Sequence, residues 1–167
     1  MDKICNIFLK LKHWQLFLIW VMGSIQMQIF IKTDFWLLSF FIYYSIIFGW
    51  IYSIGKVLNN DKTLITKKLN IWSLVHFLSM IPFALNFRNF YIESSYILSS
   101  FVEVAFGLLI MLSIFKVANL SAKSLKMKIT KRKVTFKDYI VEFFLIIYII
   151  IGVWVLQPKL NKIIDEK

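Results

Sequence analysis

Stretches rich in apolar residues alternate with short polar segments along the whole chain. Each apolar stretch is about 17 to 20 residues long, which is the length that an α-helix needs to cross the hydrocarbon core of a bilayer. The pattern predicts an all-α, polytopic integral membrane protein that forms a single domain over residues 1–167. We expect about five transmembrane helices, at residues 14–31, 35–54, 71–87, 96–115 and 140–156.

The polar links between these spans are short. Only Lys32, Thr33 and Asp34 separate the first two spans, so these should form an antiparallel helical hairpin. The third span contains Pro82, which removes one backbone hydrogen bond, but membrane helices tolerate proline where neighbouring groups satisfy the freed carbonyl. Residues 1–12 fit either a basic flank of the first span or a short helix at the membrane surface, and we expect the flank.

The composition strengthens the membrane interpretation. Hydrophobic residues make up 59% of the chain and aromatic residues 18%, whereas soluble domains are about 45–50% apolar. The excess apolar surface must therefore be buried in lipid. The single cysteine, Cys5, excludes an intrachain disulfide bond and a cysteine-based metal cluster.

The formal net charge is +11, and the basic residues are unevenly placed. With five spans, 15 of the 20 basic residues fall on the side that holds the N-terminus, residues 55–70 and residues 116–138. Short loops rich in lysine and arginine remain in the cytoplasm. We therefore expect a protein of the cell (inner) membrane, with a cytoplasmic N-terminus, a basic cytoplasmic loop at 116–138 and the C-terminus outside.

An alternative arrangement has four full spans. In it, residues 140–156 either enter the membrane and return to the same side or lie at the interface. The apolar residues Leu120, Leu125, Met127 and Ile129 also suggest that the fourth span continues as an amphipathic helix along the inner surface.

The basic loop predicts contact with anionic lipid headgroups, an attraction of roughly 1 kcal/mol per basic residue near the surface. Nucleic acid is not an expected partner, because aromatic residues that could stack on bases occur only at the far end of the loop. The expected headgroup contacts are Lys123, Lys126, Lys128, Lys131, Arg132 and Lys133.

Glu103 lies within the fourth span, about 11 Å from its outer end by the rise per residue of a helix. A carboxylate at that depth is costly, so it should face the bundle interior and be paired or protonated. Either it makes a structural hydrogen bond to another helix, or it lies in an ion or proton pathway. The candidate partners at similar depth are Gln26, Gln28 and Asn86.

Glu142 and His76 are both expected near the inner face, where they could meet and exchange a proton. The competing interpretation is that Glu142 pairs with nearby basic residues and stabilises a helix N-terminus. The only other histidine is His13, at the membrane edge. Haem ligation by the two histidines is geometrically conceivable but not expected, and we predict no metal and no cofactor.

The sequence contains none of the motifs of hydrolases, metalloproteases, nucleotide-binding proteins or dithiol oxidoreductases. We therefore expect a non-enzymatic protein that acts through helix contacts with a membrane-protein partner or with its own copies. An accessory subunit or a small immunity or effector component fits this description. The alternative is a small ion or solute channel or carrier that works as an oligomer, with Glu103 in its pathway. An intramembrane enzyme using Glu142 and His76 is a third, less favoured possibility.

Overall fold

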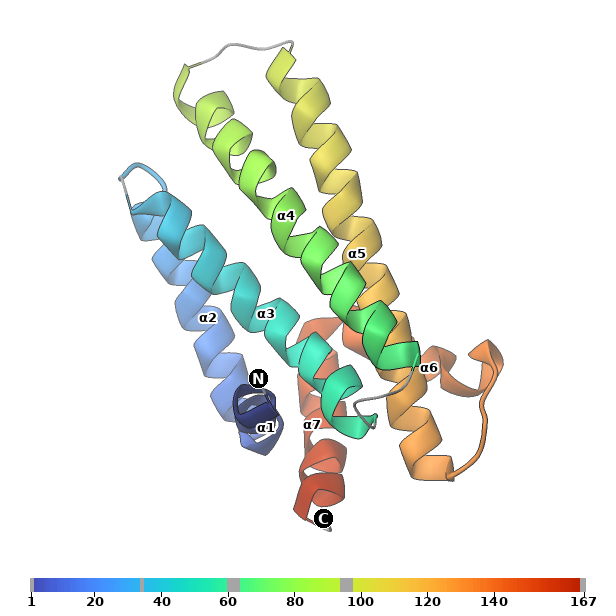
Figure 1. The fold of residues 1–167 in the computed structure, drawn as a ribbon. Helices are drawn as coiled ribbons and strands as arrows, with labels where there is room; N and C mark the ends of the chain where they lie inside the picture. Colours follow the sequence, from blue (N-terminus) through green and yellow to red (C-terminus); the bar gives the residue numbers. More distant parts are fainter. Residues whose placement is uncertain (1, 34, 60–63, 94–97, 166–167) are drawn as a thin grey trace.

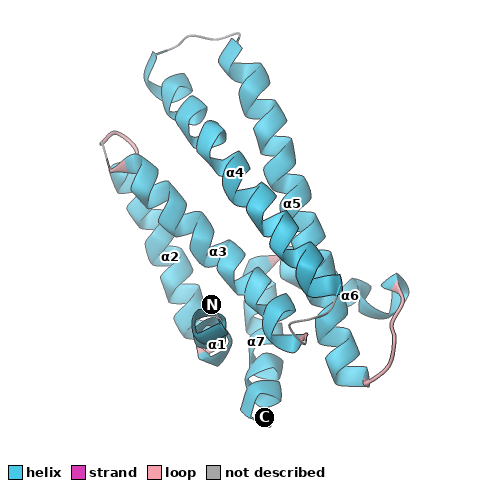
Figure 2. Ribbon diagram, in the orientation of Figure 1, coloured by secondary structure: helices cyan, strands magenta, loops and turns pink. Residues whose placement is uncertain are grey.

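The computed structural model describes residues 2–33, 35–59, 64–93 and 98–165; for residue 2, 86–93 and 98–100 it describes the backbone only. These parts of the chain are helical almost throughout and contain no strand, which confirms the predicted all-α class (Figure 2). The helices are α1 (Asp2–Lys10), α2 (His13–Phe30), α3 (Trp36–Leu58), α4 (Leu64–Glu93), α5 (Leu98–Thr130), α6 (Phe136–Ile147) and α7 (Ile149–Asp165).

The four long helices form two antiparallel hairpins that lie side by side (Figure 1). Helices α2 and α3 make the first hairpin, as the short link between them predicts. Helices α4 and α5 make the second, and α3 packs against both of them. The N-terminus, the C-terminus and the far end of α5 lie at one end of the bundle (Figure 1). We call this the basic end, since most of the lysines gather there.

Three helical segments are long and apolar enough to cross a membrane: Trp36–Leu58, Leu64–Leu85 and Phe101–Thr130. The bent pair α6–α7 makes a fourth if it is counted as one span. Helix α2 is not among them, because three glutamines lower the mean hydropathy of its 18 residues. The structure therefore shows several helices compatible with membrane insertion, but it does not confirm the count of five.

The predicted span 140–156 is not one straight helix. The chain breaks at Tyr148, whose φ and ψ are −82° and 68°, and α6 and α7 are inclined by 118°. Gly152 packs so closely against the carbonyl oxygen of Leu145 that a Cβ atom at Gly152 would collide with it. The bend therefore depends on a residue without a side chain, and α6–α7 is compatible with either a broken span or a re-entrant segment.

Two polar segments are more helical than the sequence suggested. Much of the expected loop 116–138 is the last part of α5, whose last helical residue is Thr130. The next residue, Lys131, has a positive φ of 53° and terminates the helix. This confirms that the helix of the fourth span continues beyond the apolar stretch, and it leaves only a short link before α6; its placement along the inner surface stays a prediction. Residues 2–10 form α1, so the expectation of a simple basic flank is wrong. Its Cys5 and Leu9 are buried against the bundle.

A seam of small residues on α5 lets α3 approach closely. Gly55 of α3 lies where a Cβ atom would come within 2.7 Å of the Ser121 hydroxyl oxygen. The Ser121 hydroxyl donates a hydrogen bond to the backbone carbonyl of Ile51, at 2.7 Å. Small residues at helix contacts are typical of membrane bundles, where close backbone packing replaces a hydrophobic driving force. Along the same part of α5 the buried small residues are Ser113, Ala118, Ser121, Ala122 and Ser124.

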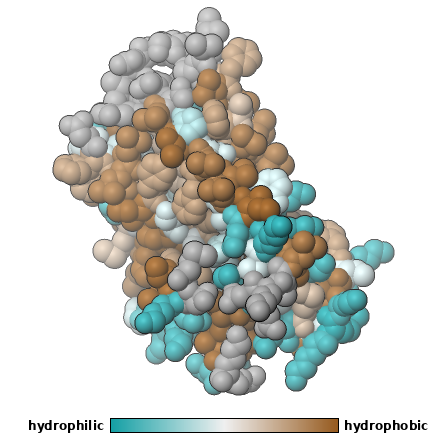
Figure 3. Space-filling model, in the orientation of Figure 1, coloured by the Kyte–Doolittle hydropathy of each residue, from teal (hydrophilic) through white to brown (hydrophobic). Residues whose placement is uncertain are grey.

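Apolar side chains cover the outer surface along the hairpins, and polar side chains gather at the basic end (Figure 3). On α4, for example, Leu74 and Leu78 are 61% and 59% exposed. On α5, Phe101 and Val104 are 73% and 61% exposed. Exposing such a surface to water is unfavourable in free energy, whereas contact with lipid chains is not.

Candidate functional site

The buried amide of Gln157 joins three helices at the basic end. Its oxygen accepts a hydrogen bond from the indole nitrogen of Trp50 at 2.8 Å. Its nitrogen donates to the backbone carbonyls of Phe8, Leu9 and Leu11, at 3.2, 3.0 and 2.7 Å. The last carbonyls of a helix have no partner within that helix. Gln157 therefore caps α1 from α7 and attaches both helices to α3.

Asn161, one turn further along α7, extends the same arrangement. Its amide nitrogen lies 3.2 and 3.4 Å from the carbonyl oxygens of Lys10 and Leu11. Both contacts lie at or just beyond the end of α1. The C-terminal helix is thus fixed beside the N-terminal helix, which is why both chain ends lie at the basic end.

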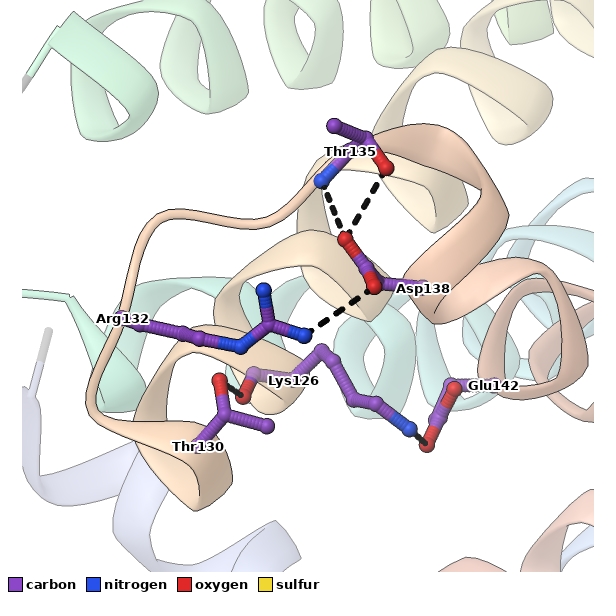
Figure 4. A network of polar contacts seen from close by, with 6 residues as sticks. All are labelled: Lys126, Thr130, Arg132, Thr135, Asp138 and Glu142. Carbon is purple, nitrogen blue, oxygen red and sulfur yellow. Dashed lines mark hydrogen bonds and ion pairs between the residues drawn. The ribbon is translucent and has the colours of Figure 1, made fainter.

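A second polar network joins the end of α5 to α6 (Figure 4). The Lys126 ammonium group lies 2.8 Å from a carboxylate oxygen of Glu142, whose side chain is only 11% exposed. Asp138 accepts hydrogen bonds from the backbone N–H and the hydroxyl of Thr135, at 2.7 and 2.9 Å. Arg132 reaches the other oxygen of Asp138 at 3.2 Å. The carboxylates therefore begin α6 and hold it against α5.

In this network Glu142 is paired with a basic residue of another helix. The residue that pairs with it is Lys126 of α5. His76 contacts different residues: its Nδ1 lies 2.9 Å from the Ser113 hydroxyl oxygen, and its ring stacks on Phe48 with centroids 3.9 Å apart. The structure does not bring Glu142 and His76 together as a proton-exchanging pair.

His76 contacts a serine that is also close to the backbone of its own helix. The Ser113 hydroxyl donates to the carbonyl of Ile110 at 2.6 Å. The second ring nitrogen of His76, Nε2, is buried with no hydrogen-bond partner among the described residues. The ring is fully buried and tethers α4 to α5.

The residues predicted to surround Glu103 are not collected around it. Gln26 approaches Ser39 of α3 at 3.5 Å, and Gln28 is exposed. The side chain of Asn86 lies outside the described residues. Glu103 is half-buried, and within the described part of the chain its Oε1 atom is buried without a hydrogen-bond partner.

The six basic residues predicted to contact lipid headgroups divide into two groups. Lys128, Lys131, Arg132 and Lys133 are exposed near the end of α5. Lys123 and Lys126 are half-buried on its last turns, and Lys126 is engaged with Glu142. The exposed group can face a headgroup layer, whereas the ion pair of Lys126 is part of the fold.

Sequence reasoning missed Gln157, Ser121 and Asn59. The signal for Gln157 is a polar side chain at the end of an apolar stretch, which in a membrane protein often has a buried partner. The amide nitrogen of Asn59 contacts the Ser124 hydroxyl and donates to the carbonyl of Gly55 at 2.7 Å. All three side chains connect helices that are distant in sequence, so no local pattern could pair them.

Among the described residues, no three or more His, Cys, Asp or Glu side chains come together in a way that could hold a metal ion. The polar side chains instead bind backbone carbonyls or one another across helix contacts. No known protein family, no curated protein and no solved structure matches this chain.

Proposed function

We propose that this chain is a non-enzymatic, multi-pass protein of the cell (inner) membrane that serves as an accessory subunit of a membrane assembly. The observation that carries the proposal is the use of its buried polar groups. Gln157, Ser121, His76 through its Nδ1 and Glu142 through the oxygen that faces Lys126 each make a contact between the protein's own helices. Contacts of this kind stabilise a fold, which supports a structural role for these residues.

The outer faces of the long helices supply the contact surface. Large apolar side chains remain exposed along both α4 and α5. In a bilayer such faces meet lipid chains or the helices of another protein. A subunit held by these contacts needs no catalytic residues, which agrees with the absence of catalytic motifs in the sequence.

We further propose that α2, α3, α4 and α5 cross the membrane and that α6–α7 forms a re-entrant unit. Both termini then face the cytoplasm. Helix α2 has 18 residues and would be about 27 Å long, close to the roughly 30 Å of the hydrocarbon core. Every basic residue except Lys32 and Arg88 would lie on the cytoplasmic side, which is 18 of the 20. This charge asymmetry is stronger than in the five-span arrangement and supports the proposal.

Affinity purification tests the assignment as a subunit. The tagged protein is extracted from its native membrane in mild detergent and analysed by mass spectrometry, with untagged membranes as the control. We expect one membrane protein to be recovered in a fixed ratio to the bait. Recovery of the bait alone or only of its own copies, in several detergents, contradicts a role as accessory subunit.

Glu103 supports a second candidate, a small channel or carrier that works as an oligomer. Its buried Oε1 has no hydrogen-bond partner among the described residues, as expected for a carboxylate that binds a passing ion. If this candidate is right, Glu103→Gln abolishes conductance or flux in reconstituted vesicles. Gln28→Leu, on an exposed face of α2, is the control and leaves flux unchanged. Equal flux in wild-type and Glu103→Gln protein removes this candidate.

A further inference from the structure

An apolar pocket opens between α1, α3 and α4 near the basic end. Its cavity volume is about 390 Å³. Ligand pockets in proteins typically measure about 300–1,000 Å³. Its walls come from all three helices: Ile4, Cys5, Phe8, Phe48, Gly49, Tyr52, Ser53, Asn70, Ser73, Leu74 and Phe77.

The surface of the pocket is almost entirely apolar. One polar pair lies at the edge nearest the basic end, where the Tyr52 hydroxyl donates to the Asn70 side-chain oxygen at 2.7 Å. The rest of the lining includes Phe48, Leu74 and Phe77. From Asn70 to Phe77 the wall extends about 10 Å along α4. An apolar wall of this length suits a long apolar chain.

Two exposed lysines adjoin the lining residues along the chain. Lys67 precedes Asn70 by one helical turn on α4, and Lys3 precedes Ile4 on α1; both side chains are exposed. We infer from these positions that an anionic group at the Tyr52–Asn70 edge would be attracted by positive charge. A zwitterionic headgroup would gain less from them.

We propose that this pocket holds an acyl chain of an anionic phospholipid from the inner leaflet, with the lipid phosphate at the Tyr52–Asn70 edge. The inference depends on the proposed membrane orientation, because only then does the pocket open at the depth of the inner-leaflet chains. It does not depend on the identity of any protein partner. A second copy of the chain fits less well, because its surface would have to bring a compensating acidic group to the lysines.

Filling the pocket tests the proposal. Leu74 lines the pocket and is 61% exposed, so Leu74→Trp should occupy the space without disturbing the core. Leu78 is one turn further along α4, 59% exposed and outside the pocket, so Leu78→Trp is the matched control. Lipid binding to the purified full chain is measured by native mass spectrometry with phosphatidylglycerol and phosphatidylcholine of identical chains.

We expect wild-type and Leu78→Trp protein to retain phosphatidylglycerol preferentially and Leu74→Trp to lose it. Lys67→Gln should reduce the preference over phosphatidylcholine by about fivefold, the factor that one basic residue near the lipid surface supplies, while Lys68→Gln should not. Equal retention by Leu74→Trp and wild type overturns the proposal. The proposal is also overturned if a free fatty acid binds as strongly as the phospholipid. Displacement of the lipid when the protein forms a dimer overturns it as well.

A cross-linking experiment on the unmodified chain provides a test that needs no variant. Phosphatidylglycerol with a photoreactive acyl chain is added to vesicles that contain the protein, and labelled peptides are mapped after irradiation. We expect adducts concentrated in residues 4–8 and 70–77. Adducts spread evenly over the outer faces of α4 and α5 contradict a specific site. This result is independent of affinity purification, so lipid binding and the role as a subunit can fail separately.

Discussion

At the scale of single residues, one amide holds the two ends of the chain together. Gln157 satisfies the carbonyls of Phe8, Leu9 and Leu11 and accepts from Trp50, and it is fully buried. In the interior of a membrane protein, a backbone carbonyl that loses its partner cannot turn to water instead. The contact between α1 and α7 therefore depends on this side chain.

Replacing Gln157 by leucine should destabilise the protein. The change keeps the size of the side chain but leaves buried carbonyls and the Trp50 N–H without partners, at an expected cost of about 1–3 kcal/mol. The loss is measured as a lower midpoint of thermal unfolding in detergent. Gln28→Leu, at an exposed position facing the lipid, serves as the control and should be nearly neutral. Equal midpoints for the two variants would show that the capping contact is dispensable.

These polar contacts also show which side-chain pairings can be predicted from the sequence and which cannot. The apolar pattern predicts that Glu142 lies near the start of its helix, and the charge pattern indicates that basic residues are available to it. Neither pattern identifies Lys126 as the partner of Glu142, because that pairing depends on where α6 begins after the segment that joins it to α5. The partner of His76 is Ser113, 37 residues away, and only the packing of α4 against α5 brings them together.

At the scale of helices, the contact between α3 and α5 depends on Gly55. A Cβ atom there would come within 2.7 Å of the Ser121 hydroxyl oxygen and 2.8 Å of a Leu69 methyl group. Distances below 3 Å force a neighbour to move. In the sequence, Gly55 is only one of several small residues, without the four-residue spacing that signals a helix pair.

Gly55→Ala should therefore weaken the bundle, by about 1–3 kcal/mol from overpacking. Gly107→Ala is the matched control, since its Cβ would lie 3.4 Å from Phe83, an ordinary contact distance. That variant should be neutral or slightly more stable, because alanine favours a helix by up to about 1 kcal/mol over glycine. Both are compared by thermal unfolding in the same detergent. A destabilised Gly107→Ala with an unaffected Gly55→Ala would contradict the packing described for this helix contact.

The helix boundaries also show the limits of a hydropathy argument. The apolar stretches place α2, α3, α4 and α5 correctly in order and connectivity. They underestimate the length of α4 and α5, which have 30 and 33 residues, because polar residues continue a helix when one face stays packed. The bend between α6 and α7 lies within an uninterrupted apolar stretch. A hydropathy pattern does not show where a helix axis changes direction, so it could not predict this bend.

At the scale of the whole molecule, the bend determines where the C-terminus lies. A straight helix over residues 140–156 would carry the tail to the far end of the bundle. With the bend, α7 returns to α1 at the basic end (Figure 1). The lysines of the tail then join those of the N-terminus and of α5, and most of the basic residues of the chain gather at one end of the molecule.

The arrangement with both termini in the cytoplasm is the central claim, and cysteine accessibility in intact cells tests it directly. The exposed residues Lys32, Lys133 and Lys162 are replaced one at a time by cysteine in a Cys5→Ser background, and a membrane-impermeant thiol reagent is applied. We expect labelling of Lys32→Cys only, with the other two variants reacting after the cells are permeabilised. Labelling of Lys162→Cys from outside, alongside Lys32→Cys, would show that α6 and α7 cross the membrane and would contradict the re-entrant unit.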